Sequence, residues 1–400
     1  MVADGKGGLA IAGEFSGALR IGDREVASAG GTDVFVARLD AAGATRFLHA
    51  LGGAGDDRAS AVAFAPGGDA VVVGQSDGRC FVARLAGDDG RERYLVRLEG
   101  KGESNCRAVA IDGHGDVWTT GYFSGSLGKA SAKGQYDLFV ARLSGADGSV
   151  QWTAAYGGLG KELPRAIAVR PSGEVLVAGQ FAGEAPVEKS EVNFGLGPVR
   201  SHGDFDAFLL SLDRDGKTRW VTTFGENGDD EINALLLGAA GEIYVSGHLQ
   251  PEGEYGGRSA HEIGNFTGFV AQFDAAGKRQ WLQPFAGASS SANAITLDDE
   301  GRLWATGPFQ GALRVSGLTL PNAGGYDVFA IAFDPRAGGA PLVAKSFGSP
   351  AMDIGRGVAR IAGGVALAGF TRGELVACGR PIGSGGQTGF LLQLREGEVR

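Results

Sequence analysis

The stretch AGGTDVFVARLDAAG, residues 29–43, contains the pattern that organises the whole chain. A glycine-rich turn leads into a short apolar run with a phenylalanine near its start, and a second turn of the form DxxG follows. The run recurs with its phenylalanine at Phe35, Phe81, Phe139, Phe208, Phe269, Phe329 and Phe390. These positions define seven repeats of about 60 residues each, and repeats of this length indicate a solenoid or a propeller.

Three further apolar segments accompany each copy of this run. In the third repeat they are AVAIDGHG (108–115) and DVWTTGYF (116–123) before the run, and SVQWTAAYGG (149–158) after it. Such segments, rich in Val, Ile, Thr and aromatic residues and bounded by Gly, Asp and Pro, are typical of strands joined by tight turns. We name the four strands A, B, C and D in chain order, so that the phenylalanine run is strand C.

Four strands per repeat are the content of one propeller blade. No segment of useful length has the apolar period of a helix. Glycine contributes 71 of the 400 residues, which fits many short turns between strands. The sequence therefore predicts one all-β domain over residues 1–400, a seven-bladed β-propeller of four-stranded antiparallel blades.

The two ends of the chain fall at unequal points of the repeat. Alignment on the strand B glycines places the first residues inside strand A, and FLLQLREGEVR (390–400) stops before a strand D. Strand D is expected six times, at 47–51, 94–98, 152–156, 220–224, 281–285 and 342–347. The blade that closes the ring is then expected to lack one strand, and an open strand edge invites strand addition by another chain at this closure seam.

Composition argues against several classes of function. The formal net charge is −9, so a global electrostatic attraction to nucleic acid is not expected. No apolar run approaches the roughly 20 residues of a membrane-spanning helix. The His and Cys residues show no metal-ligand spacing, and we expect neither a metal nor a cofactor.

Three cysteines, Cys80, Cys106 and Cys378, leave the redox state open. We favour three free, buried thiols, and one disulfide with a spare thiol is the alternative. Their number and spacing do not identify a cellular compartment.

The repeat resembles the bacterial propeller repeat family called SBBP. EVASAGGTDVFVARLDAAG (25–43) and LTLPNAGGYDVFAIAFDP (318–335) carry the resemblance most clearly, and it extends over essentially the whole chain. The resemblance implies a seven-bladed propeller in an exported or surface-attached bacterial protein. It implies no catalytic motif. The LDxxGxxxW turn is also similar to the tryptophan-docking repeat of pyrroloquinoline-quinone enzymes, whose eight blades and cofactor site find no match here.

Aspartate stands two residues before the strand C phenylalanine in four repeats, as Asp33, Asp137, Asp206 and Asp327. A ring of carboxylates for a cation is one interpretation. We favour the other, in which each side chain accepts hydrogen bonds that close the glycine-rich turn before strand C.

Arginine occupies the fourth position of strand C in three consecutive repeats, as Arg38, Arg84 and Arg142. Neighbouring repeats would place these side chains next to each other, which could form an anion-binding sector. We favour ion pairs between these arginines and surface acids, since other repeats tolerate Ser, Gln or Ala at this position.

Charged residues also gather in the connection between strand D and the next strand A. If strand A is the innermost strand, they surround one mouth of the central channel and are candidates for ligand binding. These residues are Asp57, Glu162, Asp230, Asp353, Arg107, Arg165 and Arg356. Turn capping and mutual salt bridges are the alternative, which we favour.

Hydrolase motifs are absent from the sequence. The five histidines are dispersed without HExxH, and no GxSxG is present. We therefore expect a non-catalytic binding or scaffold module, exported according to the resemblance, with a protein or glycan partner. The alternative is a propeller enzyme acting on a polysaccharide, with its site at one mouth of the channel.

Overall fold

The computed structural model describes residues 1–183, 191–225, 228–250, 254–255, 258–259, 266–287, 289–377, 380–383 and 386–395. Apart from a short 3-10 helix, Pro335–Ala337, the regular structure of these residues is β-strand. The chain divides into two compact units. Unit 1 comprises Met1–Ser201 with Leu209–Val221, and unit 2 comprises His202–Phe208 with Thr222–Arg400.

Unit 1 contains three complete four-stranded sheets. The first consists of β1 (Val2–Ala3), β2 (Leu9–Phe15), β5 (Asp33–Leu39) and β6 (Thr45–Leu51), and the second of β7 (Asp57–Phe64), β8 (Ala70–Ser76), β9 (Arg79–Leu85) and β10 (Glu92–Arg97). The third consists of β12 (Ser104–Ile111), β13 (Val117–Phe123), β16 (Asp137–Leu143) and β17 (Val150–Tyr156). In the fourth sheet, β18 (Lys161–Val169) and β19 (Val175–Gly183) belong to unit 1, whereas β22 (Asp206–Leu212) and β23 (Thr218–Phe224) carry residues of both units.

Unit 2 contains the fifth, sixth and seventh sheets. The fifth sheet consists of β24 (Glu231–Leu237), β25 (Ile243–Leu249), β28 (Thr267–Phe273) and β29 (Arg279–Pro284). The sixth consists of β30 (Ser289–Ser290), β31 (Ala294–Leu297), β32 (Leu303–Gln310), β35 (Asp327–Asp334) and β36 (Ala340–Phe347). The seventh consists of β37 (Asp353–Ile361), β38 (Gly364–Thr371) and β41 (Thr388–Arg395). In the sixth sheet β30 and β31 both pair with β32, so strand A is interrupted.

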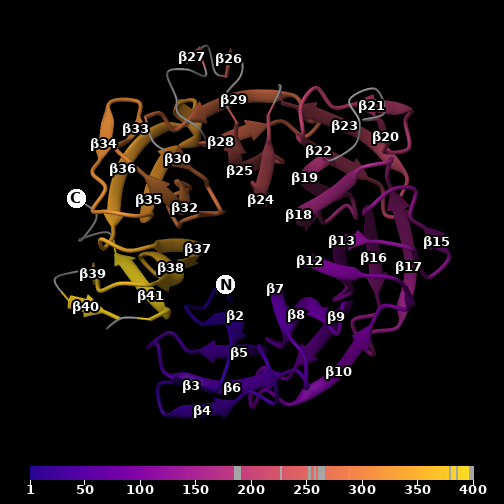
Figure 1. Cartoon of the computed structure of the whole chain (residues 1–400), viewed down its shortest axis with the longest axis horizontal. Helices are drawn as coiled ribbons and strands as arrows, with labels where there is room; N and C mark the ends of the chain where they lie inside the picture. The colour runs from indigo at the N-terminus through magenta and orange to yellow at the C-terminus, as the bar shows by residue number, and fades with distance from the viewer. Residues whose placement is uncertain are drawn as a thin grey trace. The chain divides into compact units, whose positions relative to one another are not determined.

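The first six of these sheets have their strands in the order A, B, C, D, which Figure 1 shows for the antiparallel strands β12, β13, β16 and β17. The described strands of the seventh sheet are A, B and C. The order A, B, C, D is that of a propeller blade, and it confirms the all-β prediction. The six expected D strands are β6, β10, β17, β23, β29 and β36. Strand A of the first sheet is β1, as expected, and within the described residues β41 pairs with β38 alone.

A glycine on strand B faces the strand C phenylalanine. The third sheet pairs Gly121 with Phe139, and a Cβ on Gly121 would stand 2.9 Å from the phenyl ring. The same Cβ would overlap the backbone oxygen of Asn105 on strand A. Strand A bulges next to this point, because its pairing skips Arg107 between Cys106 and Ala108. The bulge and the ring together leave room for glycine alone.

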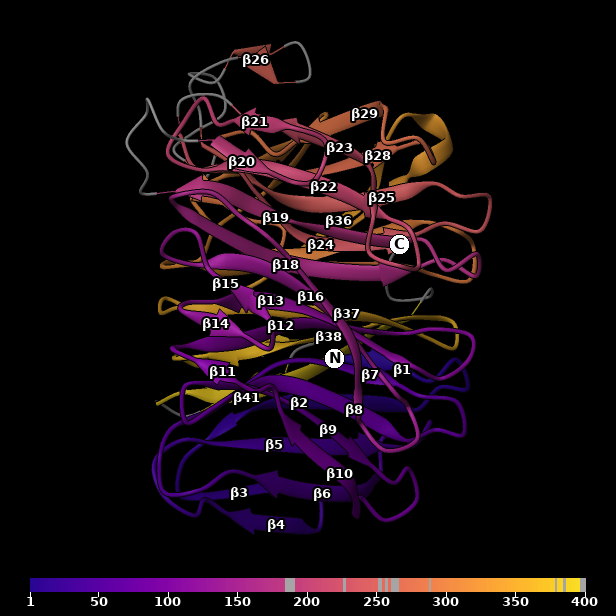
Figure 2. The same cartoon turned by 90° about the vertical axis from the view of Figure 1, so that its right-hand side faces the viewer.

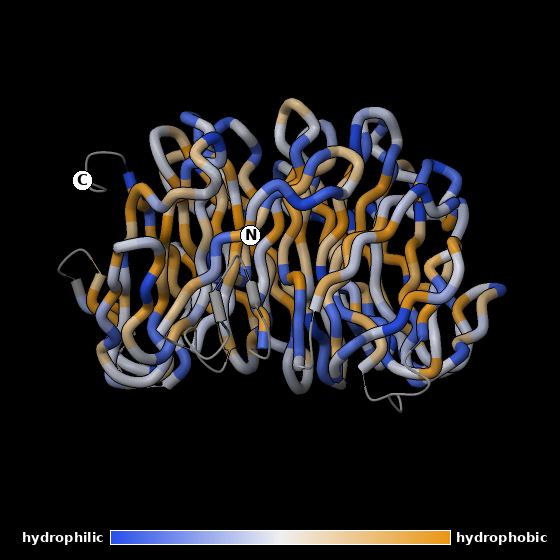
Figure 3. Tube along the Cα trace, turned by 90° about the horizontal axis from the view of Figure 1, so that it is seen from above, coloured by the Kyte–Doolittle hydropathy of each residue, from blue (hydrophilic) through white to orange (hydrophobic). Residues whose placement is uncertain are grey.

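The repeat predicts equivalent buried positions for the seven strand C phenylalanines, and six of them are buried, with exposed fractions from 0% to 7%. Phe35 is the exception, and its partial exposure corrects this prediction for the first sheet. Strand β1 contains only two residues, which pair with Leu9 and Ala10, so within the described part of the chain no bulged strand A lies opposite Gly13 to cover this ring. Figure 3 shows that the strands are mostly hydrophobic along their length, whereas the turns at their ends are more hydrophilic.

The glycine-rich excursions between strands B and C fold into small hairpins. One of them, β3 (Ala18–Ile21) with β4 (Arg24–Ala27), lies beside β6 (Figure 2). Another, β33 (Leu313–Val315) with β34 (Leu318–Leu320), buries Leu313 and Val315 in the core of its sheet. The remaining hairpins are β14 (Ser126–Leu127) with β15 (Ala130–Ser131), joined by β11 (Gly100–Lys101), β20 (Glu191–Asn193) with β21 (Pro198–Arg200), β26 (Glu254–Tyr255) with β27 (Arg258–Ser259), and β39 (Leu375–Ala377) with β40 (Arg380–Ile382).

The Gly121→Ala substitution is expected to destabilise the protein by about 1–3 kcal/mol, since the new methyl group must displace backbone or the Phe139 ring. Urea unfolding followed by tryptophan fluorescence measures the change. The matched control is Gly113→Ala in the A–B turn of the same sheet, where no atom lies within 4 Å of the new Cβ. Equal midpoints for both variants would contradict the role we give to the glycine.

Candidate functional site

The start of each strand A contacts the start of the preceding strand C. The backbone N–H of Glu162 donates to Tyr136 O, and that of Asp353 donates to Tyr326 O. These bonds bring the first residue of strand A next to the aspartate that begins strand C. The same bond recurs at Asp57, Ser104, Asp230 and Ser290.

The strand C aspartates close the glycine-rich turns. Asp137 accepts hydrogen bonds from the backbone N–H of Lys133 and Gly134, and Asp327 accepts one from Ala323. Asp33 and Asp206 accept equivalent bonds from the residue four positions before them. The turn-closing interpretation is thus confirmed for all four aspartates.

The acids predicted for the channel mouth form buried pairs with these aspartates. Asp57, Glu162, Asp230 and Asp353 are at most 2% exposed. A Cβ on Gly52, at the end of strand D, would stand 2.8 Å from Asp57 Oδ2 and would overlap the Asp33 carboxylate. The carboxyl groups of Asp33 and Asp57 are therefore close neighbours. In each of them, one oxygen accepts a backbone N–H of the adjacent turn, as the capping interpretation predicts.

Burial changes the protonation of these groups. It raises the pKa of Glu162 from 4.5 to about 8, and the neighbouring Asp137 carboxylate adds to this rise, whereas the N–H of Gly158 opposes it. Burial likewise raises the pKa of Asp137 against the opposing effect of its turn hydrogen bonds. Burial and the charge of Asp353 raise the pKa of Asp327.

The three arginines predicted for the channel mouth occupy the bulges of strand A. Arg107, Arg165 and Arg356 are each skipped in the pairing of strands A and B. Arg107 and Arg165 are half-buried and Arg356 is exposed. Ligand binding by this set stays a prediction, and because the four acids are buried it rests on the three arginines.

Other bulge residues connect neighbouring sheets. The Ser60 hydroxyl donates to Asn105 Oδ1 at 3.4 Å, and Asn293 Nδ2 donates to Gly355 O at 2.9 Å. Sequence reasoning did not identify the bulge, because a bulge is a property of pairing between strands. The glycine recurring in strand B was the available signal.

Arg38, Arg84 and Arg142 lie on three consecutive sheets of unit 1, and each pairs with an acid. Arg84 Nε lies 3.0 Å from Asp69 Oδ2, and Arg142 Nη2 lies 2.7 Å from Asp116 Oδ2. Arg38 Nη2 lies 3.2 Å from an oxygen of Asp4. These ion pairs are what the structural interpretation predicts, and the anion-binding sector stays a prediction.

Arg38 and Arg84 also reach the next sheet. A guanidinium nitrogen of Arg38 donates to Gly68 O in the A–B turn of the second sheet, and one of Arg84 donates to Gly145 O of the third. The two side chains therefore form ion pairs with acids and also connect neighbouring sheets.

A set of seven polar and aromatic residues, which we call the tyrosine network, crosses three sheets of unit 1 where their A strands begin. Its members are Ser60, Gln75, Glu103, Asn105, Tyr122, Tyr136 and Lys161. The two tyrosine rings meet edge to face, with centroids 4.9 Å apart. Tyr136 OH donates to Glu103 Oε2 at 2.7 Å, and Lys161 Nζ lies 6.0 Å from the Tyr136 ring. Sequence reasoning did not identify this network.

A second polar cluster lies in unit 2 around His248. Its Nδ1 is 3.4 Å from Ser291 Oγ and 4.0 Å from Glu231 Oε2, so one ring nitrogen faces both groups. A nucleophile–base–acid relay needs one ring nitrogen for each partner. Burial and nearby acids raise the pKa of Asp229 in the same region, and His248 opposes them. This geometry does not support hydrolysis by the described residues of the cluster.

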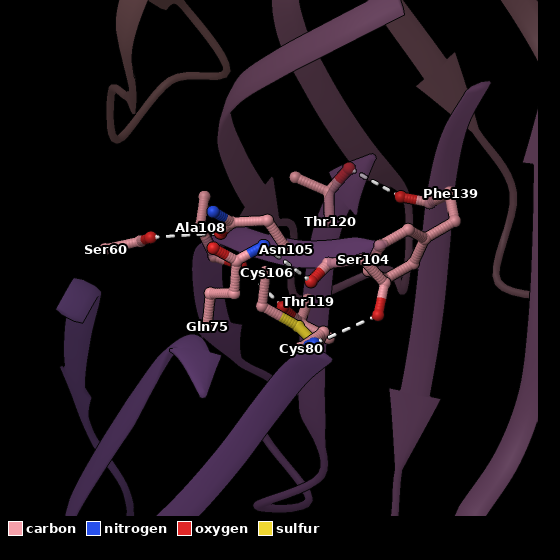
Figure 4. The surroundings of a disulfide bond; sticks show 10 residues. All are labelled: Ser60, Gln75, Cys80, Ser104, Asn105, Cys106, Ala108, Thr119, Thr120 and Phe139. Atoms are coloured by element: carbon pink, nitrogen blue, oxygen red, sulfur yellow. Dashed lines mark hydrogen bonds between the residues drawn. A yellow bond between two sulfur atoms is a disulfide. The ribbon is translucent and has the colours of Figure 1, made fainter. Parts of the chain in front are cut away.

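A disulfide joins Cys80 of strand C in the second sheet to Cys106 of strand A in the third (Figure 4). The free-thiol prediction is therefore wrong for these two cysteines, and Cys378 lies outside the described residues. The sequence left the pairing open because the two residues are 26 positions apart and meet only through the packing of two sheets. Next to the bond, the N–H of Cys80 donates to Ser104 Oγ at 3.0 Å (Figure 4).

Two features are absent from the described residues. These residues contain no group of three or more His, Cys, Asp or Glu side chains arranged to hold a metal ion. They also contain no helix long and apolar enough to cross a membrane.

No family model and no curated protein sequence matches this chain. Among solved structures, a Lactobacillus plantarum protein is 13% identical and aligns over 96% of this chain and 100% of its own, with a TM-score of 0.50. The Dos1 propeller is 11% identical over 84% of this chain and 71% of its own, with a TM-score of 0.45. BamB from Moraxella catarrhalis is 14% identical over 94% and 88%, with a TM-score of 0.38. Such similarities concern the fold alone.

The Glu162→Gln substitution tests the protonation of the buried acid. The folded protein holds a proton on Glu162 up to about pH 8, whereas the unfolded chain releases it above pH 4.5. The free energy of unfolding therefore falls as pH rises from 4.5 to 8, by up to ~1.4 kcal/mol per pH unit. We expect denaturant titrations of the Gln variant to show a flatter profile and a gain in stability at pH 8. Parallel profiles would refute the assignment.

Reduction of the disulfide is expected to lower the free energy of unfolding by about 3 kcal/mol, because the closed loop restricts the unfolded chain. Thermal unfolding with and without dithiothreitol measures this difference. The Cys80→Ala/Cys106→Ala protein is the control and should not respond to the reductant. A wild-type melting temperature unaffected by verified reduction would contradict the expectation.

Proposed function

We propose that this protein is a non-catalytic binding scaffold, and that the tyrosine network is its ligand-contacting surface. The structural positions of each repeat, namely the strand B glycine and the strand C phenylalanine, are nearly constant. The residues around them on the surface differ from sheet to sheet. A repeated framework with variable surface residues suits recognition rather than a shared reaction.

The arrangement of Tyr122 and Tyr136 is the observation that carries this proposal. Both rings are half-buried, and they stand among an amide, a carboxylate and an ammonium group. Tyrosine combines a flat apolar face with a polar tip, so it contacts amphipathic ligands at a small cost in conformational entropy. An oligosaccharide offers the complementary features, since its C–H faces pack on rings and its hydroxyls bond to Gln75, Glu103 or Lys161.

We also propose that the seven sheets close into one seven-bladed ring and that the protein is exported. The common strand order of the sheets supports the first proposal. The Cys80–Cys106 disulfide supports the second, since such bonds persist mainly in oxidising compartments. The SBBP resemblance agrees with both. The edge of β41 that no described strand covers supports strand addition by a partner chain at the closure seam.

Substitution of Tyr136 by Ala tests the proposed surface. Removal of the ring is expected to weaken binding of the best oligosaccharide from a glycan array at least tenfold, measured by titration calorimetry. The matched control is His114→Ala, an exposed residue in the A–B turn at the opposite end of the same sheet. Equal loss in both variants, or wild-type affinity in Tyr136→Ala with an unchanged fold, would refute this location. An array without any bound glycan would refute the ligand class.

A further inference from the structure

Buried acids meet each other at several junctions between a strand C and the next strand A. A junction combines three positions: the first residue of strand C, the first or second residue after strand D, and the residue at the start of the next strand A whose backbone N–H donates to the residue before strand C. Six junctions are formed by Asp33–Gly52–Asp57, Arg79–Glu99–Ser104, Asp137–Gly157–Glu162, Asp206–Gly225–Asp230, Thr267–Ala286–Ser290 and Asp327–Gly348–Asp353.

The three positions change together. Where strand C begins with aspartate, the next strand A begins with an acid and the middle residue is glycine. Where strand C begins with Arg79 or Thr267, strand A begins with serine and the middle residue is larger. None of these six junctions combines an aspartate at the start of strand C with a serine at the start of the next strand A. If each acid served only its own turn, mixed junctions would be tolerated, so the acids act as pairs.

The serine junctions show what the acids replace. Ser104 Oγ accepts the backbone N–H of Cys80, and Ser290 Oγ accepts that of Gly268, so a hydroxyl connects strand A to strand C. In the acid junctions two carboxyl groups occupy this space. The middle glycine is required because a Cβ there would overlap the carboxylate of Asp33, Asp137 or Asp327.

Three of the four acid pairs, Asp33–Asp57, Asp137–Glu162 and Asp327–Asp353, leave carboxyl oxygen atoms without a partner in the described structure. Asp33 Oδ1, Asp57 Oδ1, Glu162 Oε1, Asp327 Oδ1 and Asp353 Oδ1 are all fully buried and accept no hydrogen bond. The other carboxyl oxygens accept backbone N–H groups, for example from Gly53 to Asp57 and from Ser349 to Asp353. Two buried carboxylates side by side would be strongly unfavourable, whereas a single proton between them satisfies both groups.

The surrounding charges favour a proton over a metal cation. No ion pair with a described residue involves Asp33, Asp57, Asp327 or Asp353. Lys133 faces the third junction, but its Nζ donates to Gly157 O at 3.4 Å. Amide N–H groups point at each pair, and no third acidic, His or Cys ligand completes a metal site in the described chain. The Asp206 junction is set apart, because His202 Nδ1 lies 3.4 Å from Asp206 Oδ2.

We propose that the pairs Asp137–Glu162 and Asp327–Asp353 are proton-binding sites, each holding one proton between its two carboxyl groups at neutral pH. The proton comes from solvent, and the pair then carries one negative charge instead of two. One carboxyl donates to the other and connects strand C to the following strand A. Alkaline solution removes the proton and replaces this bond by repulsion, so the junctions are strongest in neutral and acidic surroundings.

The Asp327–Asp353 pair is suited to the test because all its neighbours lie in unit 2. Asp353→Asn supplies an amide that donates to Asp327 without an added proton. We expect the infrared C=O stretch of protonated carboxyl groups to be present in wild type at pH 7 and reduced in this variant. The fall in melting temperature between pH 6 and pH 9 should also become smaller. Asp327→Asn should act in the same way if the first variant folds poorly.

The matched control is Asp298→Asn, a buried acid whose oxygens accept N–H groups from Glu300, Arg302 and Trp304 and which has no carboxyl partner. It should lower the melting temperature without changing the infrared band or the slope with pH. A band and slope unchanged in both pair variants would overturn the proposal. A melting temperature that chelator lowers and Ca²⁺ restores in wild type, but not in Asp353→Asn, would identify a cation site instead.

Discussion

Across strands B and C, a phenylalanine ring lies over a glycine that has no Cβ to keep it away, and the backbone of strand A bulges toward the same point. Gly121, Phe139 and the bulge at Arg107 show this contact in the third sheet. The contact sets the register of three strands at once. A shift by one residue would place a side chain where only hydrogen fits.

The bulge also determines where the variable residues of the protein stand. Because the pairing of strands A and B skips one residue of strand A, the side chain of this residue is turned out of the regular alternation. In different sheets this residue is Ser60, Arg107, Asn233 or Arg356, so the same backbone feature presents different chemistry. The tyrosine network and the His248 cluster both lie next to such bulges, which explains why polar groups gather at this end of the sheets.

Connections between consecutive sheets use several kinds of bond at equivalent places. Serine hydroxyls accept backbone N–H groups at two junctions, and at one of these a disulfide also joins Cys80 to Cys106. Paired carboxyl groups occupy the other four junctions. The arginines of strand C add bonds to neighbouring turns. A repeat chain in which each unit contacts mainly its neighbours depends on such interfaces for its stability.

The sequence by itself determined the repeat, the all-β class, the four-strand pattern of the repeat and the turn-closing aspartates. Strand periodicity and turn chemistry are local properties of the chain. The tertiary structure alone decided which acids meet, since Asp137 and Glu162 are 25 positions apart in the sequence. It likewise decided that Cys80 meets Cys106, that Phe35 is only partly covered, and that Tyr122 and Tyr136 meet. Each of these depends on which strands pair and which sheets pack together, and no short segment of sequence encodes these contacts.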